Sequence, residues 1–109
     1  MKIIEEIEPI IAKIESLHLN DLKVYEYWDQ LIEILGRDEE ETIRFFKEIR
    51  NENIISHLCG QFPEISGKLQ SDRLIVTLEE LDKRFPHLKI APFIQGAIEW
   101  LSHDYPSKE

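Results

Sequence analysis

Residues 3–17 read IIEEIEPIIAKIESL, and this stretch decides the fold class. Its isoleucines and Leu17 recur at steps of three and four residues, the spacing that places side chains on one face of an α-helix. Four glutamates stand between them. The pattern predicts an amphipathic helix over residues 2–17. The sequence leaves open whether Pro9, which lies inside it, kinks the helix or begins it.

The same helical period continues along the rest of the chain. It indicates further helices near residues 21–35, 39–50, 53–69, 72–85 and 92–102. Gly60 and Pro63 make the fourth helix short or broken, with a second piece from Pro63 to Leu69. No strand is expected, because the β-branched residues 75–77 lie inside a helical period. Gly96 would allow close approach of a neighbouring helix.

These segments predict an all-α fold of about six amphipathic helices in antiparallel pairs. The pairs form either a compact bundle or a short solenoid, and no internal repeat decides between them. With 109 residues and no linker-like stretch, the chain is expected to be a single domain over residues 1–109.

The composition indicates where in the cell the protein is expected. No apolar run approaches the roughly 18 residues that a membrane span needs. Acidic residues at positions 5, 6 and 8 interrupt the apolar start, so it does not read as a secretory signal, and we expect a cytoplasmic protein. Cys59 is the only cysteine, which excludes an internal disulfide and a cysteine-based zinc cluster. We expect it to be a small buried side chain.

The charge narrows the choice of partners. There are 22 acidic and 13 basic residues, a formal net charge of -9. Residues 1–55 hold 14 acids and 7 bases, so most of the negative charge lies in the first half. Nucleic acids and anionic membranes carry the same sign and are not expected as partners. A basic protein has the opposite charge and is therefore compatible as a partner.

Three acids form a stripe on the second predicted helix. Glu26, Asp29 and Glu33 are spaced so that they share the face opposite the apolar one. Like charges at this spacing destabilise a helix by a few tenths of a kcal/mol per pair. Such a stripe is either an ordinary solvated face or a surface kept for a partner. Tyr27 beside it is either an interface anchor or a side chain at the edge of the core.

A run of four acids, Asp38 to Glu41, begins the third predicted helix. Asp38 and Glu41 have capping-box-like spacing, and acids in a first turn complement the helix dipole. Local helix stability therefore explains most of the run. Together with the stripe, the run could also form a continuous negative patch. The protein-binding site predicted in this way consists of Glu26, Tyr27, Asp29, Glu33, Asp38, Glu39, Glu40 and Glu41.

Catalytic and cofactor motifs are missing from the sequence. There is no glycine-rich phosphate loop, nucleophile elbow or HExxH pair. His18, His57, His87 and His103 do not pair with one another or with an acid at a recognised ligand spacing. We therefore expect no enzyme activity, no cofactor and no metal. A metal or acid–base site on the acidic stripe is the less favoured alternative.

The second half of the chain resembles a known group of proteins. The matching segments are IIS at 54–56, FPEIS at 62–66 followed by Lys68-Leu69, and LEELDKRFP at 78–86. Over roughly residues 54–101 the chain resembles the small helical immunity proteins that accompany bacterial polymorphic toxins. These include the toxins of contact-dependent growth inhibition and of wall-associated systems. The stretch LDKRFP is the most specific part.

The resemblance implies a function and a partner. Immunity proteins bind the C-terminal domain of their cognate toxin and block its active site. Many such toxins are nucleases with basic sites, where the carboxylates of an acidic protein would take the places of phosphates. The alternative is a helical adaptor or regulator without a toxin partner, binding through an apolar groove around Phe93 and Trp100. The sequence does not determine the oligomeric state.

Overall fold

The computed structural model describes residues 2–18 and 20–102, and all regular structure within them is helical. The all-α prediction is confirmed. Two short 3-10 helices, η1 (Cys59–Gln61) and η2 (Pro86–Leu88), accompany the α-helices. The α-helices are α1 (Ile3–Glu15), α2 (Lys23–Leu35), α3 (Glu39–Glu48), α4 (Glu52–Leu58), α5 (Phe62–Leu69), α6 (Asp72–Arg84) and α7 (Ala91–Glu99).

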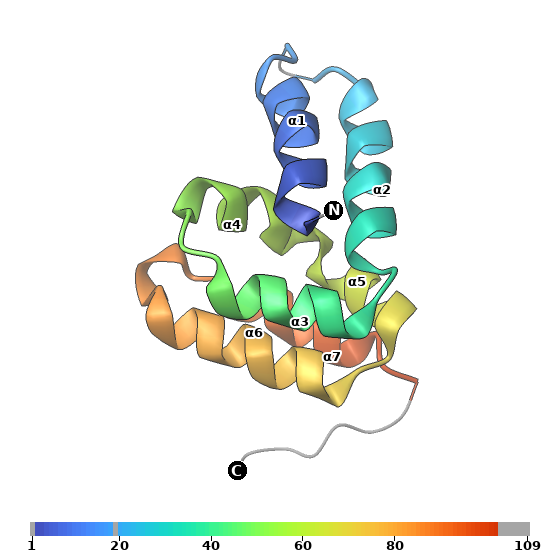
Figure 1. Cartoon of the computed structure of the whole chain (residues 1–109). Coiled ribbons are helices and arrows are strands. Elements are labelled where there is room, and N and C mark those ends of the chain that lie inside the picture. The colour runs from blue at the N-terminus through green and yellow to red at the C-terminus, as the bar shows by residue number, and fades with distance from the viewer. Residues whose placement is uncertain (1, 19, 103–109) are drawn as a thin grey trace.

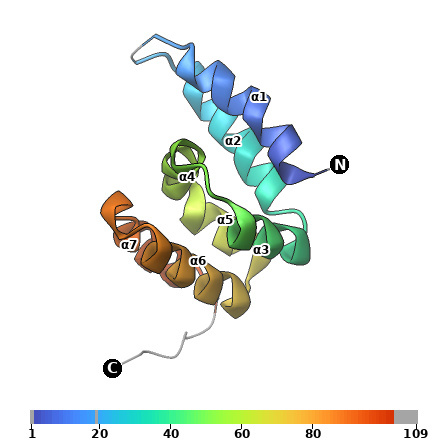
Figure 2. The same cartoon turned by 60° about the vertical axis from the view of Figure 1, so that its left-hand side comes forward.

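The helices stack in three tiers that follow the order of the chain. Helices α1 and α2 form an antiparallel hairpin, α3, α4 and α5 form the middle tier, and α6 and α7 form the third (Figure 1). Figure 2 shows the tiers one above another. The hairpin contacts α3, α4 and α5, while α3 packs on α6 and α5 packs on α7. The stacked tiers form one compact body of 42 × 30 × 28 Å.

Local hydrogen bonds begin the helices close to the predicted residues. The Asp38 carboxylate accepts the Glu41 backbone N–H at 2.9 Å, and the Ser71 hydroxyl accepts the Leu74 N–H at 3.1 Å. Both are N-caps that satisfy otherwise unpaired donors of a first turn. The Asp21 carboxylate accepts the first N–H of α2 at 2.9 Å.

Pro9 is the seventh residue of α1, so it does not begin the helix. Proline has no N–H, and the Glu5 carbonyl one turn earlier loses its usual partner. Pro9 and Glu5 are both exposed, which leaves water free to reach that carbonyl. The isoleucine face of α1 continues on both sides of Pro9, with Ile7 and Ile10 buried.

The apolar faces meet in one core that runs through all three tiers. Ile7 of α1, Leu31 of α2, Phe46 of α3 and Leu78 of α6 are fully buried. The rings of Phe46 and Phe62 pack edge to face with centroids 5.5 Å apart, which joins α3 to α5. Edge-to-face packing is a favoured geometry for aromatic pairs.

Helical periodicity places Tyr25 on the apolar face of α2 together with Trp28, but its side chain is not buried. Tyr25 is 58% exposed, whereas Trp28 one turn later packs against the core and is half-buried. The physical reason is visible in Figure 1: the first turns of α2 extend beyond the middle tier, so only α1 lies beside them. Helical periodicity gives the face of a helix but not the length over which a neighbour covers it.

Helices α5 and α7 approach closely at two glycines. A Cβ added to Gly96 would lie 2.9 Å from Cγ of Pro63, and one added to Gly67 would lie 2.8 Å from Cε3 of Trp100. The predicted role of Gly96 is therefore confirmed. Trp100 lies over Gly67 with half of its surface exposed, so it is a residue at the boundary of the core.

Arg84, in the last turn of α6, caps the end of α3. Its guanidinium donates hydrogen bonds to the carbonyls of Phe46 at 3.2 Å, Lys47 at 2.9 Å and Ile49. The same group lies 5.3 Å from the ring centroid of Phe85. These carbonyls belong to the end of a helix, where intrahelical donors are missing. Arg84 therefore fixes both the end of α3 and the start of its connection to α4.

Candidate functional site

The α2 stripe of Glu26, Asp29 and Glu33 lies on the surface, as predicted. Glu26 and Asp29 make no hydrogen bond or ion pair with any residue that the structure describes. Glu33 lies 3.6 Å from the ammonium of Lys68 on α5, at an exposed position. Such exposed pairs contribute little stability. The stripe therefore presents carboxylates that the fold itself hardly uses.

The hairpin is the most acidic part of the molecule. Residues 2–35 contain eight acids and three bases, a net charge of -5 out of -9. Since the hairpin is the first tier of the stack, these charges lie at one end of the protein (Figure 2). A concentrated field of one sign steers a partner of opposite charge.

Tyr27 lies at the edge of the core on the α1 side of the hairpin. Its side chain is half-buried and packs against the core. The ammonium of Lys13 on α1 lies 6.0 Å from the ring centroid, near the outer limit for a cation–π contact. Intramolecular packing therefore accounts for the position of Tyr27.

The run from Asp38 to Glu41 divides between two sides of α3. Asp38 caps the helix, while Glu39 and Glu40 face α6. Glu39 accepts a hydrogen bond from Ser71, and Arg73 donates to both oxygens of Glu40 at 2.8 and 3.0 Å. The hydrogen bonds and charge of Arg73 lower the pKa of Glu40. These two carboxylates are thus engaged in the contact between α3 and α6.

Two cations stand where the stripe meets the α3 run. Arg37, in the α2–α3 connection, donates to both oxygens of Glu6 at 3.0 and 2.8 Å. This hydrogen bonding raises the pKa of Arg37, with further contributions from Glu41 and Glu33. Lys68 lies beside Glu33. The acids of α2 and α3 therefore have positive charges at their junction.

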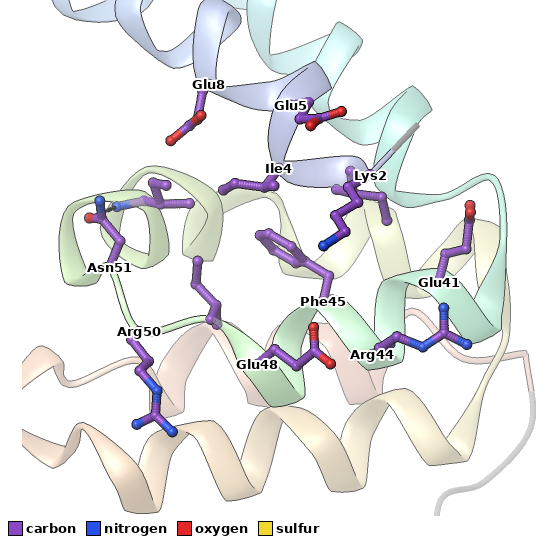
Figure 3. Close-up of a pocket in the computed structure, with 13 residues that line it drawn as sticks. Lys2, Ile4, Glu5, Glu8, Glu41, Arg44, Phe45, Glu48, Arg50 and Asn51 are labelled. Atoms are coloured by element: carbon purple, nitrogen blue, oxygen red, sulfur yellow. Dashed lines mark hydrogen bonds between the residues drawn. The ribbon is translucent and has the colours of Figure 1, made fainter.

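Sequence reasoning missed a groove between α1, α3 and α4, with a volume of about 730 Å³. Phe45 points into it from α3 and Ile4 faces Phe45 from α1 (Figure 3). The only signals in the sequence are the doubled apolar positions Ile3-Ile4 and Phe45-Phe46, which widen an apolar face beyond one buried stripe. We call the following side chains the groove floor: Ile3, Ile4, Phe45, Ile49 and Ile54.

Charged side chains surround the groove floor. Glu5 and Glu8 lie on the α1 side and Glu48 lies on the α3 side (Figure 3); we call these three the rim acids. None of them forms a hydrogen bond or ion pair with the described residues. Lys2 reaches over the floor, whereas the Arg50 guanidinium is directed away from the groove. Glu41 and Arg44 also line the groove, so its charged residues are four acids and three bases.

The outer end of the hairpin also carries exposed apolar side chains. Leu22 is 76% exposed and Tyr25 58% exposed, beside a hollow of about 470 Å³. The Tyr25 ring packs edge to face on Trp28 with centroids 5.2 Å apart. Half-buried Leu17 and Val24 also line this hollow.

The histidines and the cysteine occupy ordinary surroundings. Nε2 of His57 lies 3.0 Å from Glu15, and the pKa of Glu15 is lowered by hydrogen bonds from Asn53 and His57. Nε2 of His87 lies 2.6 Å from an oxygen of Glu52. Burial raises the pKa of the Cys59 thiol. His18 is exposed, and His103 lies outside the described residues.

No three His, Cys, Asp or Glu side chains within residues 2–18 and 20–102 are grouped so that they could hold a metal ion. Within the same ranges, every helix is too short or too polar to cross a membrane. Comparison with known protein families, curated proteins and solved structures gives no match. The resemblance to immunity proteins stays a prediction carried by the residues quoted for it.

Proposed function

We propose that this chain is a cytoplasmic immunity protein that binds and neutralises the C-terminal domain of a cognate bacterial toxin. The toxin is of the nuclease class, and the acidic surface of the hairpin covers its basic active site. The observation that carries the proposal is the exposed α2 stripe, where Glu26 and Asp29 lack partners among the described residues.

The energetics of the stripe support a role outside the fold. Like charges three and four residues apart destabilise α2 by a few tenths of a kcal/mol per pair. The only ion pair along the stripe is the exposed one between Glu33 and Lys68, among the residues described. A basic partner would remove this repulsion on binding, so the stripe fits a surface that is completed by another protein.

The charge distribution also supports fast recognition. Complementary potentials raise association rates far more than they raise affinity, and the effect weakens with salt. Carboxylates spaced along a helix can occupy the positions where a nuclease holds phosphates. To inhibit the toxin, this chain then needs only to cover the active site of the toxin, and none of its own residues needs to react.

The direct test is co-purification with the C-terminal domain encoded by the gene immediately upstream, at low and high salt. A complex that abolishes the toxicity of that domain, and that weakens as salt increases, is the expected result. A harmless domain, or one that does not bind, would refute the proposal.

A matched pair of variants tests the binding surface. Both E26K/D29K on α2 and E80K/E99K on α6 and α7 change the net charge from -9 to -5 at exposed positions. We expect E26K/D29K to slow association at least tenfold more than E80K/E99K, because only the first reverses charges at the interface. Equal effects would show that net charge alone matters.

A second candidate is the adaptor function, which the exposed aromatic residues of the third tier favour. Phe93 on α7 is 39% exposed, and Trp100, the residue that directly follows α7, is 53% exposed. Exposed aromatic side chains are frequent interface anchors. If W100A abolishes partner binding while E26K/D29K leaves it intact, the adaptor function replaces the immunity function.

A further inference from the structure

The outer end of the hairpin presents apolar side chains that the core does not use. Leu22 and Tyr25 are the most exposed large apolar side chains among the described residues. Half-buried Leu17 and Val24 join them around the hollow of about 470 Å³. None of these four belongs to the hydrophobic core or packs directly against it, and we call them the tip patch. The fold therefore leaves a genuinely exposed apolar surface at this end.

The free carboxylates of α2 border the tip patch. Leu22 precedes α2 with helical backbone angles, φ -68° and ψ -13°, so it lies one turn before Glu26. Tyr25 lies one turn before Asp29, and side chains four residues apart are neighbours on a helix surface. Glu26 and Asp29 make no hydrogen bond or ion pair with the described residues. One continuous surface thus combines exposed apolar groups with two carboxylates that the fold does not use.

Positive charges lie to the side of this surface. No lysine or arginine lines the hollow, where the charge-bearing side chains are exposed His18 and Asp21, the residue that caps α2. Lys23 follows Leu22 directly, so its side chain is turned by about 100° around the helix. Lys13 lies over a tyrosine ring on another side of α2. The charge next to the exposed apolar groups is therefore negative.

These charges select the occupant. A second copy of the chain docked through the same patch would bring its own Glu26 and Asp29 against those of the first copy. An anionic lipid surface would meet the same repulsion. A basic protein is attracted, and an apolar recess on it would remove Leu22 and Tyr25 from water. Tyrosine is a frequent interface anchor, because its ring covers a large area with few rotatable bonds.

We propose that the tip patch anchors the partner protein in an apolar recess that borders the partner's basic surface. Leu22 and Tyr25 enter the recess, while Glu26 and Asp29 pair with lysine or arginine side chains beside it. The acids then govern the rate of association and the tip patch governs the rate of dissociation. The proposal rests on the proposed function for the identity of the partner and adds the contact that holds that partner in place.

Binding kinetics with the toxin domain separate the anchor from the charges. L22S/Y25S removes two exposed apolar groups at the tip, and V76S/F93S removes two from α6 and α7, so both keep the net charge at -9. We expect the complex of L22S/Y25S to dissociate about tenfold faster than that of V76S/F93S, with equal association rates. L22S alone changes a residue that precedes α2, so it repeats the test without altering the helix.

Peptides test the tip patch without the toxin. The probe is KLLKKLLKKLLK with blocked ends, and the matched control KSSKKSSKKSSK keeps its charge without its apolar side chains. Each is titrated into ¹⁵N-labelled full-length protein while amide chemical shifts are followed. We expect the leucine peptide to shift the amides of Leu22, Tyr25 and Asp29, and to bind about tenfold more tightly than the serine peptide. L22S/Y25S should remove this difference, whereas V76S/F93S should keep it.

Several results would overturn the proposal. They are no binding of the leucine peptide, shifts centred on Phe45 or Trp100, equal binding of the two peptides, or equal effects of the two double variants. Tip-patch shifts that depend on protein concentration without peptide would assign the patch to a second copy. If the leucine peptide binds the tip patch but the toxin domain does not bind the protein, the proposed function fails and the tip-patch assignment stands. If the toxin domain binds and L22S/Y25S leaves its dissociation rate unchanged, the tip-patch assignment alone fails.

Discussion

Replacing Arg84 by methionine tests whether a single side chain from α6 fixes the end of α3. Methionine keeps an unbranched apolar stem of similar reach and removes the guanidinium. The substitution leaves the carbonyls of Phe46, Lys47 and Ile49 without their donor. It retains the packing that the aliphatic part of Arg84 contributes.

The expected loss follows from the three hydrogen bonds. A hydrogen bond to a charged group contributes about 1.5–3 kcal/mol where it is shielded from water. The bond to Lys47 is exposed and adds little, and the bonds to Phe46 and Ile49 are only partly buried, so each of these two contributes about 1 kcal/mol, below that range. We expect the free energy of unfolding to fall by about 2 kcal/mol in total. For a domain of this size that lowers Tm by about 8–16 °C.

Urea unfolding followed by helical circular dichroism measures the loss. The slope of the free energy against urea should stay unchanged, since the variant buries the same surface. The matched control is Arg73→Met, which removes an exposed ion pair with Glu40. We expect that control to cost less than about 1 kcal/mol. Arg84→Lys should fall between the two, because one ammonium cannot reach three carbonyls.

The reasoning fails if Arg84→Met and Arg73→Met lower the stability by the same amount. It also fails if Arg84→Lys is as stable as the unmodified protein, since charge alone would then suffice. A change in slope would mean that the variant alters the extent of folding rather than one capping interaction.

Three further predictions concern pH, backbone contact and thiol chemistry. The pKa values of Glu15 and Glu40 are lowered below the ordinary 4.5. These two carboxylates therefore stabilise the folded protein above pH 4.5, and this contribution is lost as the pH falls through their folded-state pKa values. Between about pH 6 and pH 3, Tm should accordingly fall less steeply in E15Q/E40Q than in the unmodified protein. Gly96→Ala should lower the free energy of unfolding, because the added Cβ would lie 2.9 Å from a proline on α5. At Gly60 an added Cβ meets open space, so Gly60→Ala should leave the free energy of unfolding unchanged or raise it by up to about 1 kcal/mol. Urea titration measures both variants. Since burial raises the pKa of Cys59, iodoacetamide should alkylate it at pH 7 more slowly than a free-cysteine peptide, and equal rates would contradict this.

The helices were predictable because their causes are local. The isoleucine spacing of α1 and the cap Asp38 act within one or two turns, and each lies where the sequence indicated. Tyr25 could not be placed in the same way. Its position on α2 satisfies the apolar period, but its exposure depends on how far the middle tier extends.

The surface contacts were less predictable because their partners are distant in sequence. Capping and dipole arguments treat Glu39, Glu40 and Glu41 as equivalent, yet the first two face Ser71 and Arg73, more than thirty residues away. The groove was not predictable for the same reason. Its floor exists only because α1, α3 and α4 meet there, and no single helix pattern contains that information.

The stacking of tiers in chain order has a consequence for how the molecule opens. The hairpin is a terminal tier, held to the others through one face, so it can detach as a cooperative unit while the rest stays folded. Amide hydrogen exchange should accordingly be faster in α1 and α2 than in the buried parts of α3 and α6.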